Sequence, residues 1–86
     1  MNKTQRQTLK AVFSVPVRSD IKWTSIENLF KVGAKVSQGR GSRVRVSLNG
    51  IKAVFHEPHP EKVTDKGAVK AVKEFLINAD IKPEDY

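Results

Sequence analysis

The sequence predicts a two-layer α+β domain in which a three-stranded antiparallel sheet carries helices on one face. The stretch 43–56 alternates like two strands joined by Asn49-Gly50, the dipeptide most typical of a two-residue hairpin turn. Three segments outside this hairpin carry apolar residues at helical spacing. Apolar side chains occupy only one face of the hairpin, so helices must cover that face while the other stays open.

A two-residue turn determines which residues of the hairpin face each other. It sets Arg43 opposite His56 and Leu48 opposite Ile51. Because side chains alternate along a strand, one face is apolar and the other is mainly cationic. The apolar face, which we expect beneath the helices, consists of Val44, Val46, Leu48, Ile51, Ala53 and Phe55. The opposite face consists of Arg43, Arg45, Ser47, Lys52, Val54 and His56.

Two capping boxes predict two short helices before the sheet. Thr4 begins the first box, and apolar residues at helical spacing extend this helix over residues 5–13. Thr24 begins the second, which predicts a helix over residues 25–32 that ends at Gly33. The first of these helices lies at the N-terminus and is an addition to the helix, three strands and helix that form the rest of the predicted domain.

One further strand and one further helix complete the predicted order. Residues 34–37 can form the first strand with Val36 inward, and a glycine-rich turn joins this strand to the hairpin. A final helix begins at a cap, either Thr64 or Asp65, and ends near Asn78.

The composition is that of a soluble folded protein. Apolar residues make up 38% and charged residues 29%, which excludes a disordered chain. The 86 residues suffice for a single domain, which we interpret as residues 1–86, with an N-terminal extension (1–22) and a flexible tail (80–86). Cysteine is absent, so thiolate chemistry is excluded. No stretch approaches a membrane span or a signal peptide, so we expect no membrane partner and a cytoplasmic location.

The net charge of +7 is concentrated in the first half of the chain. Residues 1–50 hold ten of the sixteen Lys and Arg residues but only two carboxylates, Asp20 and Glu27. No acidic residue lies between Asn28 and His56, so the cationic face has no local counter-charge. This pattern is typical of a protein that binds a polyanion, most often nucleic acid. The alternative is a solvated face whose cations prevent edge-to-edge association.

The chemistry that these residues allow is metal-free cleavage of RNA. His56 and His59 lack an obvious third ligand and the carboxylates are scattered, so we expect no metal and no cofactor. RNA supplies its own nucleophile, the 2′-hydroxyl, and the protein then needs a general base and cations. Either histidine could be the base beside Arg43, Arg45 and Lys52. The alternative is that His56 is a strand-end residue and His59 a turn residue, each with a structural role.

The glycine-rich turn at residues 39–42 adds to the cationic face. It precedes a strand rather than a helix, so it is neither a P-loop nor a dinucleotide-binding loop. It can still present backbone N–H groups and Arg40 to a phosphate. The residues that we predict to bind RNA are Arg40, Ser42, Arg43, Arg45 and Lys52.

The sequence resembles the HicA toxins of bacterial HicA–HicB toxin–antitoxin modules over residues 25–79. Gly41-Ser42, the hairpin 43–55 and His59-Pro60 carry the resemblance. It implies a fold like that of a double-stranded-RNA-binding domain, which agrees with the predicted order of elements. It also implies metal-independent cleavage of mRNA, growth arrest, and neutralisation by a HicB-like antitoxin.

The chain departs from this family at one position. The catalytic histidine of the family follows Gly-Ser directly or after one residue, where this chain has Arg43 and Val44. Three interpretations stay open: His56 supplies the base, His59 supplies it, or the chain is an RNA-binding module that does not cut. A basic interaction protein for an acidic partner is a further alternative.

Overall fold

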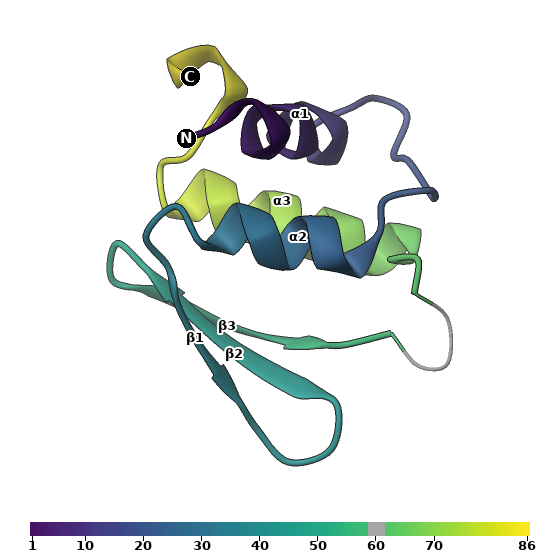
Figure 1. Cartoon of the computed structure of the whole chain (residues 1–86), viewed down its shortest axis with the longest axis vertical. Helices are drawn as coiled ribbons and strands as arrows, with labels where there is room; N and C mark the ends of the chain where they lie inside the picture. The colour runs from purple at the N-terminus through teal and green to yellow at the C-terminus, as the bar shows by residue number, and fades with distance from the viewer. Residues whose placement is uncertain (59–61) are drawn as a thin grey trace.

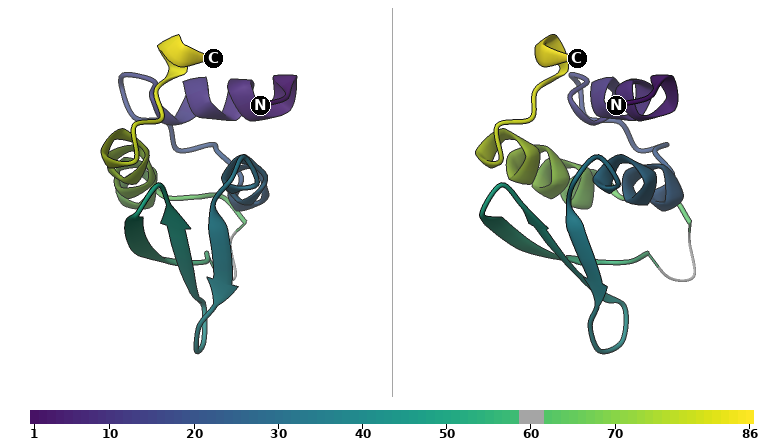
Figure 2. Two further views of the ribbon diagram at one scale, coloured as in Figure 1. Left: turned by 90° about the vertical axis from the view of Figure 1, so that its left-hand side faces the viewer. Right: turned by 60° about the vertical axis from the view of Figure 1, so that its left-hand side comes forward.

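In the computed structural model, which describes residues 1–58 and 62–86, a three-stranded antiparallel sheet lies beneath two helices, and a third helix lies above these (Figure 1). The helices are α1 (Lys3–Val12), α2 (Trp23–Phe30) and α3 (Lys66–Asn78). The strands, in spatial order, are β1 (Lys35–Gln38), β2 (Arg43–Leu48) and β3 (Ile51–His56). Further views show all helices on the same side of the sheet (Figure 2). The predicted α+β fold, similar to a double-stranded-RNA-binding domain with an extra N-terminal helix, is confirmed.

The register predicted for the hairpin is also confirmed. β2 and β3 pair from Arg43 opposite His56 to Leu48 opposite Ile51. Asn49 and Gly50 both have positive φ (51° and 81°), as a two-residue turn of this type requires. Val44 and Val46 are each only 2% exposed, whereas Arg43 and Arg45 are exposed. The apolar face of the hairpin therefore packs against the helices, and its cationic face is open.

Aromatic rings join the sheet to the helix layer. Phe55 of β3 stacks on Phe30 of α2, with ring centroids 5.7 Å apart and planes inclined by 21°. Phe75 of α3 meets the Phe55 ring edge-on at 5.7 Å, and Trp23 lies 6.4 Å away. Because all four side chains are buried, this cluster holds the sheet against α2 and α3.

The first strand differs from the prediction at Val36. Val36 pairs with Val46 and so belongs to the helix-facing side, as predicted, but its side chain is 48% exposed. The reason is that β1 is an edge strand that runs away from the helices towards the β1–β2 turn (Figure 1). The prediction that Val36 lies inward was therefore wrong with respect to burial.

The extra N-terminal helix covers the outer side of α2 and α3. Leu9 and Val12 are buried, and the Gln5 side chain donates a hydrogen bond to the Asn28 carbonyl of α2 at 2.9 Å. The capping box predicted at Thr4 is wrong. Asn2 is the cap, and it exchanges hydrogen bonds of 2.8 and 2.9 Å with Gln5. Asn is as good an N-cap residue as Thr, and Gln5 completes the capping box with Asn2, so the helix can begin two residues earlier than predicted.

The capping box predicted for the second helix is wrong as well. α2 begins at Trp23, and no side chain caps it. Instead, the Trp23 N–H donates to the Lys62 carbonyl at 2.9 Å, next to a β-bridge between Lys22 and Val63. Backbone pairing thus satisfies the first amide, and a side-chain cap at Thr24 is not needed.

The C-terminal part agrees with one of the two predicted caps. The Asp65 carboxylate accepts a hydrogen bond of 2.7 Å from the Ala68 N–H and begins α3. After α3, Ile81 is buried and residues Pro83–Asp85 form a short 3-10 helix beside α1. The flexibility of residues 80–86 and the division at residue 22 stay predictions. Within the described residues, no helix is long and apolar enough to cross a membrane.

Candidate nucleic-acid interface

The open face of the sheet arranges its side chains in three rows that run across the strands. The first row contains Lys35, Ser47 and Lys52, the second Ser37, Arg45 and Val54, and the third Arg43 and His56. Successive rows lie two residues apart along a strand, which is roughly 6.6 Å. Since β2 is the central strand, Arg45 lies at the centre of this face. Hereafter we call these eight residues the open face.

The open face is hollowed into a groove of about 540 Å³. Its lining consists of the six residues of the first two rows and of Val36, Val46 and Ala53, which lie between these rows along the strands. The two rows contribute two hydroxyl groups, the exposed Val54 side chain and the stems of three long basic side chains. This volume lies within the range of roughly 300–1,000 Å³ that is usual for sites of small ligands.

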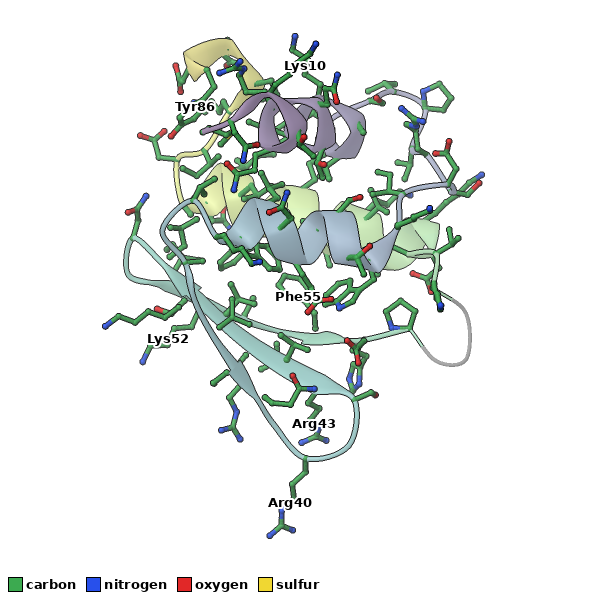
Figure 3. The ribbon with its side chains drawn as sticks, viewed as in Figure 1. Lys10, Arg40, Arg43, Lys52, Phe55 and Tyr86 are labelled. Carbon is green, nitrogen blue, oxygen red and sulfur yellow. The ribbon has the colours of Figure 1, made fainter. Side chains whose placement is uncertain are left out.

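Among the residues that the structure describes, the cations of the open face have no acidic partners. The ion pairs within residues 1–58 and 62–86 are Arg18–Asp20, at 2.7 Å, and Lys82–Asp80, at 3.9 Å, and neither lies on the sheet. Arg43 and Lys52 project away from the helices, while Phe55 points towards them (Figure 3). An exposed group of like charges without counter-ions attracts an anion.

The third row places an imidazole beside a guanidinium. His56 ends β3 and pairs directly with Arg43 at the start of β2. The pairing continues for one more residue, because the Glu57 N–H donates to the Ser42 carbonyl at 2.7 Å. Backbone hydrogen bonds on both sides thus hold His56 in place, while its side chain is exposed. The row combines a group that can accept a proton with one that can stabilise negative charge.

The turn between β1 and β2 extends the cationic surface beyond the third row. The Gly39 N–H donates to the Arg43 carbonyl at 2.8 Å, and Gly41 has a φ of 63°, which closes the turn. Arg40 projects from its tip, away from the rest of the molecule (Figure 3). Ser42 is half-buried and precedes Arg43 in the alternation, so the structure does not bring it onto the open face.

Carboxylates lie near this end of the sheet, but on its helix-facing side. Partial burial raises the pKa of Glu27 in α2 above its ordinary value, the negative charge of Glu57 raises it further, and Lys31 opposes the shift. Since Glu57 follows His56 in the alternation, its side chain belongs to the opposite face from the imidazole. Glu27 and Glu57 therefore lie away from the open face, and neither forms an ion pair with its cations.

The second predicted catalytic residue, His59, lies outside the described residues. Within residues 1–58 and 62–86, no three His, Cys, Asp or Glu side chains come close enough together to hold a metal ion.

Sequence reasoning missed four residues of the open face as site residues: Lys35, Ser37, Ser47 and Val54. The alternation Lys35–Val36–Ser37 contained the signal for the first two, because an inward Val36 implies outward neighbours. The pairing of Lys35 with Ser47 could not be predicted, since the β1–β2 turn has no two-residue hairpin signal.

Comparison with known proteins adds one finding. A family model described as the HicA toxin of bacterial toxin–antitoxin matches residues 26–81, well over half of the chain. The match includes most of α2, the whole sheet and α3, and it leaves α1 outside. Neither the curated proteins nor the solved structures contain a significant match.

Proposed function

The chain belongs to the HicA toxins of bacterial toxin–antitoxin systems, and from this premise we propose that it is a metal-independent endoribonuclease that cleaves mRNA. It acts in the cytoplasm, without a cofactor, and a HicB-like antitoxin neutralises it. We propose Arg40, Ser42, Arg43, Arg45 and Lys52 as the RNA-binding residues, as the sequence predicts. Arg43, Arg45 and Lys52 belong to the open face, whereas Arg40 and Ser42 belong to the adjacent β1–β2 turn.

The observation that supports this proposal most is the third row of the open face. The resemblance implies that Arg43 or Val44 occupies the position of the family's histidine, and His56 lies directly opposite Arg43 on the neighbouring strand. Paired residues on adjacent strands lie roughly 4.5–5.5 Å apart. An imidazole at His56 can therefore reach the same bound phosphate as one at position 43 would. We assign the general base to His56, with His59 in a supporting role.

The proposed reaction needs only groups of the protein and of the RNA, together with solvent water. The imidazole of His56 accepts the proton of a 2′-hydroxyl, whose oxygen attacks the adjacent phosphorus and displaces the 5′-oxygen of the next nucleotide. Arg43 and Arg45 stabilise the negative charge that develops on the phosphate oxygens. The leaving 5′-oxygen takes up a proton from water and His56 returns its proton to the solvent, so the products are a 2′,3′-cyclic phosphate and a free 5′-hydroxyl.

A second candidate function is RNA binding without cleavage. The absence of a histidine at both positions where the resemblance places it, Arg43 and Val44, favours it, because neither a protonated guanidinium nor a valine side chain can act as a base. Both functions use the same cationic surface, so only a test of cleavage separates them.

The proposed antitoxin partner follows from the charge and exposure of the open face. An inhibitor that blocks RNA must cover the three rows, and its contact surface should be acidic. Expression of the toxin alone is expected to arrest growth, and co-expression of the antitoxin is expected to restore it.

The test of the proposal is cleavage of labelled mRNA by purified protein in the presence of EDTA. We expect discrete fragments that carry 2′,3′-cyclic phosphate ends, because the mechanism uses the 2′-hydroxyl and no metal ion. RNA that is retained but intact would leave only the binding function.

A further inference from the structure

We propose that the groove formed by the first two rows of the open face is a subsite for one unpaired nucleotide, next to the phosphate that is cleaved. The inference rests on the proposed function, since it assigns to the RNA substrate a single-stranded conformation at this place. According to this inference, the open face binds unpaired RNA, although the fold is similar to that of a domain that binds double-stranded RNA.

The shape of the groove is the first reason. A cavity of about 540 Å³ on a surface only three strands wide can admit one nucleotide. The bases of an A-form duplex are stacked on one another, and its wide minor groove presents only their edges and the 2′-hydroxyls. A duplex can therefore touch the rim of this groove but cannot fill it.

The lining is the second reason, because it suits a base as well as a phosphate. Val54 is 54% exposed in the middle of a cationic surface. An apolar side chain at this place can contact a base, but it cannot bind a phosphate. Ser37 and Ser47 offer hydroxyl groups that can donate to or accept from a base edge. Lys35 and Lys52 flank Ser47 on the two outer strands, about 9.6 Å apart across β2, and can hold one phosphate between them.

The base has a stacking partner, although none of the described residues that line the groove has an aromatic ring. Trp23, Phe30, Phe55 and Phe75 are all buried in the core. Unpaired bases in RNA complexes also stack on the guanidinium plane of arginine. Arg45 lies between Ser37 and Val54 in the second row, so its guanidinium and Val54 can enclose a base.

The position of the groove determines which nucleotide it takes. The second row lies roughly 6.6 Å from the row of Arg43 and His56, which is two residues along the strand. A base in the groove therefore belongs to a nucleotide that adjoins the scissile phosphate. The subsite would hold that nucleotide unstacked and so orient the 2′-hydroxyl towards His56.

The test is a binding measurement on RNA that cannot be cleaved. Three fluorescent 12-nucleotide probes carry 2′-fluoro groups in place of the nucleophile: a single strand, the same strand in a duplex, and a single strand in which alternate nucleotides lack their bases. We expect the single strand to bind at least about fivefold more tightly than either of the others, because stacking of one base supplies that much. The duplex carries the higher charge density, so electrostatic attraction alone predicts the opposite order.

Two variants locate the base. Arg45→Lys keeps the charge but removes the planar group, and Val54→Ala shortens the apolar floor. Each is expected to bring the affinity for the intact single strand down to that for the abasic probe. Lys70→Ala, which removes an exposed cation from α3, is the control and should keep the difference between the probes. Circular dichroism verifies that each variant is folded.

The outcomes separate this inference from the proposed function. Equal affinity for the intact and abasic strands, or tighter binding of the duplex, would overturn the subsite even if the protein cleaves mRNA. Base-dependent binding through Arg45 and Val54 would support the subsite even if mRNA stays intact in EDTA, a result that refutes only the ribonuclease.

Discussion

The two faces of the β2–β3 hairpin are made from alternate residues of the same chain and differ in what they contribute. Phe55 is 5% exposed and contacts aromatic rings of α2 and α3, whereas its neighbour Val54 is 54% exposed and lies outside the core cluster of the described residues. Burial of apolar area in the core accounts for an apolar side chain at Phe55, but it does not account for one at Val54. We infer that the helix-facing side stabilises the fold. The residues of the open face contribute little to stability, so they can instead take part in binding and catalysis.

The largest expected effect is on stability, at Phe55. Phe55→Ala should lower the free energy of unfolding by about 3–5 kcal/mol, because it leaves a cavity between Phe30 and Phe75. Val54→Ala, one residue away, should change it by less than about 1 kcal/mol. Urea denaturation of both variants measures the difference. Equal losses would show that the two faces do not differ as we describe.

The next effect is on catalysis, at His56. His56→Ala should reduce the rate of mRNA cleavage on the order of a hundredfold or more, because it removes the general base. Its affinity for RNA should change little, and its stability should match that of the wild type, since the side chain is exposed. His59→Ala should lose less activity. Wild-type rates in both variants would exclude either imidazole as the base.

A smaller effect is expected on the salt dependence of RNA binding. Arg45→Ala should make the slope of log affinity against log salt concentration shallower by about 0.7–1, the value for one lost phosphate contact. Fluorescence anisotropy at several salt concentrations gives this slope. The same slope in wild type and variant would show that Arg45 makes no phosphate contact.

The smallest effect concerns the acidic pair on the helix-facing side. Because the pKa of Glu27 is raised in the folded state, its contribution to stability is greatest at low pH and is lost as the pH rises through that pKa. Glu27→Gln should therefore stabilise the protein slightly at pH 7 and have almost no effect below pH 4. Thermal unfolding of both proteins across this range measures the difference, and a variant less stable at pH 7 would contradict the assigned shift.

Much of the fold could be predicted because local patterns and global packing agree in this chain. Asn49-Gly50 alone determines the pairing of twelve residues in β2 and β3, including that of Arg43 with His56. The helix starts were less predictable. The α2 helix begins where the Trp23 N–H donates to the Lys62 carbonyl. This hydrogen bond joins segments that are distant in the sequence, so no local sequence pattern predicts it.

The open face was predictable only in part, for a related reason. Alternation identified Arg43, Arg45 and Lys52 from sequence. The groove depends on how the three strands curve together and on β1 as an edge, and both are tertiary properties. Only the structure therefore shows that Lys35 and Ser37 lie near Arg45 and that Val54 lines the groove.

The most direct test of the open face as the RNA interface compares two variants that lose the same charge. One is Arg43→Ala/Arg45→Ala/Lys52→Ala on the open face. The other is Lys10→Ala/Lys66→Ala/Lys70→Ala on the exposed surfaces of α1 and α3. With labelled single-stranded RNA at about 0.1 M salt, the first should bind about a hundredfold more weakly than wild type, the loss expected for three phosphate contacts. The second should bind within about threefold of wild type. Equal losses in the two variants would contradict the interface, because binding would then follow net charge and not the open face of the sheet.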